Sequence, residues 1–186
     1  ILPSSPPERQ RRLLDLVAAR DRSFAAEASD AAAIEALIAN QETAFRMQVA
    51  VPDVLDVARE PEHVRRLYGL DAEDEHARLY GLQALRARRL VEAGVRFVEI
   101  TCPSFDGNNS PWDQHGQLKS LHEKNARVTD RAVAALLVDL KARGLLDETI
   151  VLWGGEMGRT PHTPAVTPEC GRDHHVDGYT MFLAGG

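Results

Sequence analysis

Apolar side chains in the first part of the chain recur at the three- and four-residue spacing of amphipathic helices. One stripe predicts a helix from Glu8 to about Ala28, and another predicts a helix that starts after the capping pair Ser29-Asp30. Pro52 is expected to interrupt the second helix, because proline lacks the backbone N–H that a helix interior needs. We predict that the two helices form an antiparallel hairpin. The apolar positions are Leu13, Leu14, Leu16, Val17, Phe24, Ile34, Leu37, Ile38, Phe45 and Met47.

Helical spacing continues in the middle of the chain. Short helical pieces are predicted over 53–59 and 62–68, and two long helices over about 74–92 and 117–143. Each long helix is followed closely by a glycine, which is the residue that most often ends a helix. The long helices also carry apolar stripes, so each is expected to bury one face.

Three apolar runs have the composition of β-strands instead. They are VRFVEIT (95–101), TIVLWGG (149–155) and YTMFLAGG (179–186). The second is almost continuously apolar, which is typical of a strand buried on both faces in a parallel sheet. Because these runs alternate with helices, we predict an α/β fold with a mostly parallel sheet flanked by helices. The predicted organisation is a helical segment over 1–72 and an α/β portion over 73–186.

Composition narrows the class of protein. The chain has 186 residues, enough for one core with a smaller attached part, and a net charge of -6. It contains no long basic run, so nucleic-acid binding is not expected, and no apolar stretch long enough to span a bilayer. Cys102 and Cys170 are too few for a disulfide scaffold. They can pair only if their loops converge, and we interpret them as ordinary thiols. Ile1 replaces an initiator methionine, which indicates a fragment or a processed chain.

Candidate chemistry lies in the segments next to the predicted strands, because ligands of open parallel sheets bind at the carboxyl ends of the strands. Carboxylates and imidazoles recur there, and together they are ligands of zinc, manganese and related divalent ions. Arginines in the same segments are suited to holding a phosphate or sulfate group. The candidate metal ligands are Asp113, His115, Glu156, Asp173, His174 and His175, with Asp106 nearby in the first loop; the candidate catalytic or anion-holding residues are Glu156, Arg159 and Arg172.

Each of these residues also has a plain structural interpretation. Asp113 is as suited to capping the helix near Gln117 as to binding a metal. Glu156 and Arg159 can form a surface ion pair. The adjacent histidines can pack a ring on a neighbouring aromatic side chain. The recurrence of acid and histidine in successive segments favours a metal site over these alternatives.

Longer segments of the chain resemble a bacterial family known as domain of unknown function 1501. The similarity runs from about Ala44 to the last residue. The family in turn resembles the alkaline phosphatase and sulfatase superfamily of metal-dependent hydrolases. The segments that carry the likeness are AFRMQ, RRLYGLD, ARRLVEAGVRFVEI, WDQHG, LLVDLKARGLLDETIVLWGGEMGRTP and GRDHHVDGYTMFLAGG.

The resemblance implies an alkaline phosphatase-like fold, export to the periplasm, and hydrolysis of a small phosphate or sulfate ester with zinc, manganese, calcium or iron. Asp113 and His115 stand where the superfamily has its first ligand pair, and Glu156 where it has a second. His174 or His175 stands where a later histidine completes the site, and Asp173 is either a ligand or a residue that orients one.

Two departures from that superfamily shape the expectation. The chain has Glu156-Met157 where the superfamily has an Asp-His pair, and no strand with a nucleophile precedes Glu8. The chain is therefore expected to be an incomplete part of a larger domain, with little turnover by itself. The alternative is an exported, non-catalytic binding or surface protein that keeps the hydrolase fold. A third hypothesis is purely structural and predicts that Asp113, Glu156 and His175 lie far apart.

Overall fold

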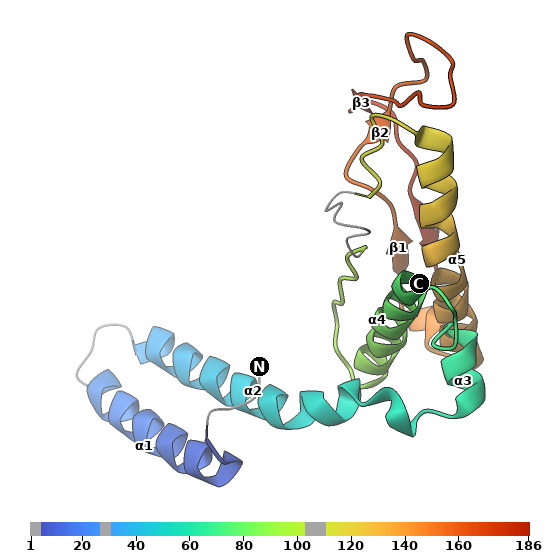
Figure 1. Ribbon diagram of the computed structural model, residues 1–186. Coiled ribbons are helices and arrows are strands. Elements are labelled where there is room, and N and C mark those ends of the chain that lie inside the picture. Colours follow the sequence, from blue (N-terminus) through green and yellow to red (C-terminus); the bar gives the residue numbers. More distant parts are fainter. Residues whose placement is uncertain (1–4, 27–30, 103–110) are drawn as a thin grey trace. The chain divides into compact units, whose positions relative to one another are not determined.

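The computed structural model describes residues 5–26, 31–102 and 111–186, and most of these residues are helical (Figure 1). The chain divides into two compact units, Ile1–Asp56 and Val57–Gly186. Within the described ranges, no helix combines the length and the apolar character that crossing a bilayer requires.

The first unit is built from α1 (Pro7–Ala25) and α2 (Ala31–Leu55). α1 begins as the sequence predicts, with proline at its first position and Glu8 in its first turn. α2 corrects one expectation, because the helix continues through Pro52 instead of ending there. Pro52 lies in the last turn of the helix. Proline has no N–H, so one hydrogen bond is lost there, and the regular turns before it outweigh that loss.

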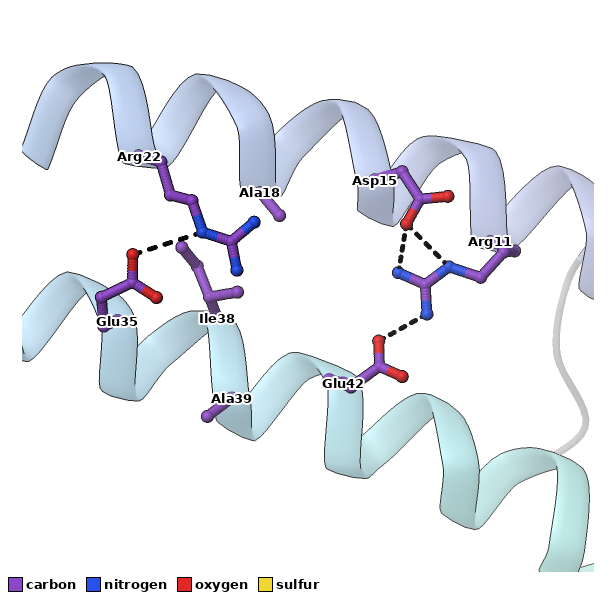
Figure 2. Close-up of a pocket in the computed structure, with 8 residues that line it drawn as sticks. All are labelled: Arg11, Asp15, Ala18, Arg22, Glu35, Ile38, Ala39 and Glu42. Carbon is purple, nitrogen blue, oxygen red and sulfur yellow. Dashed lines mark hydrogen bonds and ion pairs between the residues drawn. The ribbon is translucent and has the colours of Figure 1, made fainter.

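α1 and α2 lie antiparallel, which confirms the predicted hairpin. Arg11 pairs with Glu42, and Arg22 pairs with Glu35 at 3.3 Å, so later positions on α1 meet earlier positions on α2. The Arg11 guanidinium also lies 5.0 Å from the centroid of the Phe45 ring. Figure 2 shows these ion pairs across the pocket between the helices. The pocket is lined by Arg11, Asp15, Ala18, Arg22, Glu35, Ile38, Ala39 and Glu42.

Helix packing dominates the second unit. α4 (Glu75–Glu92) and α5 (Leu118–Ala142) pack side by side, and α3 (Glu62–Leu67) contacts α5 (Figure 1). Asp74 caps α4 by accepting a hydrogen bond from the backbone N–H of His76 at 2.8 Å. The bounds of α4 and α5 agree with the predicted helices to within one residue at each end. Between the helices lies a core of Val64, Tyr68, Tyr80, Ala84, Leu85, Val128, Ala132 and Ala135.

A buried arginine links the helices of the second unit. The Arg88 side chain is only 1% exposed, and its guanidinium lies 2.8 Å from Glu60, 2.9 Å from Asp139 and 2.6 Å from Glu92. Tyr68 donates a hydrogen bond to the same Asp139 carboxylate at 3.1 Å. Burial, and then the neighbouring Asp139 carboxylate, raise the pKa of Tyr68. These contacts tie α4 and α5 to Glu60, which directly follows a 3-10 helix at Val57–Arg59.

The strands are short and antiparallel. β1 (Val151–Trp153) pairs with β4 (Phe182–Ala184), and β2 (Gly158–Arg159) pairs with β3 (His174–His175). The predicted mostly parallel sheet flanked by helices is therefore wrong, and the alkaline phosphatase-like fold is not supported. The apolar run over 95–101 forms no strand. In the part of the chain that the structure describes, two 3-10 helices complete the elements, η1 (Val57–Arg59) and η2 (Leu146–Glu148).

The physical reason for the error is the connection between the strands. A parallel pair needs a long crossover, usually a helix, whereas the residues 154–181 that join β1 to β4 contain no helix. The chain therefore returns antiparallel to itself. The apolar faces of α4 and α5, which suited a sheet equally well, cover each other instead.

Candidate metal site

Two segments far apart in the sequence are held together by backbone hydrogen bonds before α5. The N–H of Arg172 donates to the carbonyl of Gln114 at 3.0 Å, and the N–H of Gln117 donates to the carbonyl of Glu169 at 2.9 Å. An isolated antiparallel bridge joins Gly116 to Cys170. The segment 114–118 is thus held by the return segment 169–172.

Gly171 permits the close approach of these two backbones. A Cβ atom at this position would lie 1.9 Å from the carbonyl carbon of His115, a distance that real Cβ atoms essentially never show. Only glycine therefore fits there without a backbone shift. The consequence is that the position of His115 is fixed by the return segment.

The β2–β3 ribbon supplies the second part of the site, and Figure 1 shows it beside the start of α5. Arg159 pairs with His174 and Gly158 pairs with His175 in its register. The pairing extends one residue further, because the N–H of Thr160 donates to the carbonyl of Asp173 at 2.8 Å. Directly opposite residues of an antiparallel pair face the same side, so Arg159 and His174 share one face.

Three side chains meet on that face. Nε2 of His115 lies 3.1 Å from Oδ1 of Asp113, and Nε2 of His174 lies 3.0 Å from the same oxygen. The two Nε2 atoms are 3.3 Å apart. All three residues are exposed, and their donor atoms form a small triangle open to solvent. We call Asp113, His115 and His174 the triad.

Arg159 also contacts the triad. Its Nη1 lies 2.6 Å from Oδ1 of Asp113, and its Nη2 donates to the carbonyl of Trp112 at 3.4 Å. Hydrogen bonding to His174, and then to Arg159, lowers the pKa of Asp113 to about 2. Asp113 is therefore ionised at neutral pH, the state in which a carboxylate binds metal ions.

Asp173 contacts the other side of one imidazole. Its Oδ1 lies 3.1 Å from Nδ1 of His115, the ring nitrogen that faces away from the triad. The Asp173 side chain is 81% exposed, and its backbone is fixed by the hydrogen bonds with Thr160. Asp173 thus touches a residue of the triad without belonging to it.

A family comparison adds to this geometry. The model of the family described as "Protein of unknown function (DUF1501)" matches residues 3–186. The chain belongs to this family. No curated protein and no solved structure matches the chain. The expected likeness to alkaline phosphatases and sulfatases is supported neither by these comparisons nor by the observed strand arrangement.

The remaining predicted site residues lie outside the triad. Glu156 is exposed in the segment after β1, and Arg172 is exposed and joined to the site through its backbone. His175 follows His174 in an extended strand, where successive side chains point to opposite faces, so it is directed away from the triad. Asp106 lies outside the described residues. The suggestion that Asp113 caps the next helix does not apply, because that helix begins after Gln117 without a side-chain cap.

Sequence reasoning missed an aromatic cluster beside the triad. The Trp112 ring packs edge-on against Trp153 and against His122, with centroids 5.9 Å and 5.2 Å apart. Its indole N–H donates to the Cys102 sulfur at 3.2 Å. Both cysteines are free thiols. Trp112 directly precedes Asp113, so its packing helps to fix the position of Asp113. In the sequence, the place of Trp112 beside this acid is the signal that could have drawn attention to the cluster.

Proposed function

We propose that the triad binds a divalent transition-metal ion. The supporting observation is the spacing of the donor atoms, which lie 3.0, 3.1 and 3.3 Å from one another. Metal–ligand bonds of about 2.1 Å place neighbouring donors roughly 3.0 Å apart in an octahedral shell and roughly 3.4 Å apart in a tetrahedral one. The observed separations match this range, which supports a site for one ion.

The donor set narrows the choice of metal. Calcium prefers shells made of oxygen, whereas two imidazoles with one carboxylate suit zinc, iron or manganese. Three protein ligands that are open to solvent leave coordination positions for water or substrate. That arrangement is characteristic of catalytic metal sites, because structural sites are usually closed by four protein ligands.

The proposed activity is hydrolysis of a phosphate or sulfate ester. A divalent ion held by the triad would supply Lewis acidity, polarising a substrate oxygen and lowering the pKa of a water molecule. Water adds to phosphorus or sulfur, and the ester oxygen leaves as the alcohol, so that the products are an alcohol and inorganic phosphate or sulfate. Arg159 offsets the charge of Asp113, and an ion added to this pair leaves the site net positive, which favours an anionic ester.

The test compares two adjacent histidines. We expect the purified chain to bind about one zinc ion, measured by competition with a fluorescent chelator, and His174→Ala to weaken binding at least about tenfold. His175→Ala is the matched control, since it removes the same group from the opposite face of the same strand, and it should bind zinc like the parent. Equal losses in both variants, or no binding by the parent, would contradict the site.

Hydrolysis is assayed separately with aryl phosphates and aryl sulfates, using chain loaded with zinc, manganese or iron. The proposed activity requires turnover that depends on added metal and disappears in His174→Ala but not in His175→Ala. Metal binding without turnover of any of these esters would remove the hydrolase proposal and leave a metal-binding protein.

A further inference from the structure

The geometry points to Asp173 as a positioning residue that fixes which nitrogen of His115 faces the triad. This role rests on the proposed metal site and assigns to Asp173 a function different from that of a metal ligand. Asp173 contacts Nδ1 of His115 at 3.1 Å, whereas the triad is formed by Nε2. Because the two nitrogens point away from each other across the ring, this contact keeps the Asp173 carboxylate outside the triad.

The contact with Asp173 favours one tautomer of His115, against the Asp113 carboxylate that lies 3.1 Å from Nε2 of the same ring. A carboxylate accepts hydrogen bonds, so the contact at 3.1 Å is made when Nδ1 of His115 carries the proton. The Nε2 atom then keeps its lone pair, and that lone pair faces Asp113 and His174. The opposite tautomer would place a proton where the ion must bind.

The backbone holds Asp173 in place for this contact. Its N–H donates to Oγ1 of Thr160 at 3.2 Å, and its carbonyl accepts from the N–H of Thr160 at 2.8 Å. Asp173 directly precedes His174, and successive side chains of an extended segment point in opposite directions. Two adjacent residues therefore contact the His115 ring at its two different nitrogens, one to hold the tautomer and one to share the ion.

The first arm of the experiment uses the metal-free chain. Long-range proton–nitrogen NMR of histidine-labelled protein at about pH 8.5, where imidazoles are neutral, reports the tautomer of each ring. We expect His115 to carry its proton mainly on Nδ1 in the parent and to shift toward the Nε2–H form in Asp173→Asn and Asp173→Ala. Asp173→Glu should restore part of the parent population, because a carboxylate is again within reach.

The second arm measures zinc affinity by chelator competition. Asp173→Asn should weaken zinc binding about 10–100-fold, the usual effect of losing a residue that orients a ligand, and Asp173→Glu should recover part of the loss. Asp177→Asn is the matched control: it removes the same charge from an exposed position in the turn after β3, and it should change affinity less than about twofold.

The two arms separate this role from the metal site itself. A parent chain that binds no zinc would remove the proposed function, while the NMR arm would still decide whether Asp173 sets the tautomer. An Nε2–H form in the parent, or a tautomer unchanged by Asp173→Asn, would overturn the positioning role. The positioning role would also be overturned if Asp177→Asn lost as much zinc affinity as Asp173→Asn, since that would indicate an effect of charge alone.

Discussion

Arg159 and His174 face each other across the β2–β3 ribbon, and both side chains reach the same oxygen atom of Asp113. The two contacts have opposite consequences for a metal ion. His174 would contribute a nitrogen donor to the proposed ion, whereas the fixed positive charge of Arg159 repels a cation that approaches this oxygen. The ribbon would therefore supply both a ligand and a competitor of the proposed metal ion.

Removing the competitor should strengthen metal binding. We expect Arg159→Gln to bind zinc about fivefold more tightly than the parent, equivalent to ~1 kcal/mol for a partly exposed charge pair. Arg172→Gln is the control, because this arginine is exposed and its backbone N–H joins it to the site. Weaker zinc binding in Arg159→Gln would mean that Arg159 supports the ligand geometry of Asp113 more than it repels the ion.

The Asp113 carboxyl should titrate far below its usual range. Its pKa of about 2, compared with 3.8 for an unperturbed carboxyl, is set first by His174 and then by Arg159. Because the folded-state pKa is the lower one, the stability gained from this carboxylate is complete above the unfolded-state pKa and is lost as the pH falls toward 2. Carbon-detected NMR of the metal-free chain measures this titration. The pKa should rise in His174→Ala, and an unchanged value would show that the imidazole contact is absent in solution.

A methyl group at Gly171 should disturb the site without changing any ligand. In Gly171→Ala the new Cβ meets the backbone of His115, so the two segments must separate and zinc binding should weaken at least about tenfold. Gly155→Ala is the control, since a Cβ there would lie 3.8 Å from its nearest neighbour, an ordinary contact. Chelator competition on both variants tests this, and equal affinities would contradict the close approach.

The buried arginine should contribute much more to the stability of the second unit than an exposed arginine does. Arg88→Ala removes the buried cation that Glu60 and Asp139 share and leaves each carboxylate with one more exposed partner, Arg89 or Arg143, which should reduce the free energy of unfolding by about 3 kcal/mol. Arg66→Ala, which breaks an exposed pair with Glu62, should cost about 0.5 kcal/mol. Both tryptophans lie in this unit, so urea unfolding followed by their fluorescence reports on it. Similar losses in the two variants would contradict the buried network.

The helices were predictable because their signals are local. The cap at Asp74 and the apolar stripes of the long helices lie within the segments that they define, and the observed ends of α4 and α5 follow them closely. The α1–α2 hairpin was predictable for the same reason. Pro52 was misjudged because its cost depends on its distance from the end of the helix, which the periodicity alone does not give.

Strand direction was not predictable from the apolar runs. The composition of β1 and β4 identified two strands, but their relative direction depends on the path of the chain between them. The sequence drew attention to Asp113, His115 and His174 because acids and histidines recurred next to strands. They are brought together by an antiparallel ribbon and not by the edge of a parallel sheet. The choice between the two adjacent histidines required the register, because both have the same composition and nearly the same position.

The register of the β2–β3 ribbon decides which of two successive residues faces the triad. β2 and β3 contribute two residues each, and only one alignment turns His174 toward Asp113. Moving β3 by one residue would exchange the positions of His174 and His175. It would also turn Asp173 away from His115. The connecting residues 161–168 can lengthen or shorten at little entropic cost. Relatives of this chain should therefore differ in length between the two strands, but insertions of a single residue within β3 should be incompatible with metal binding.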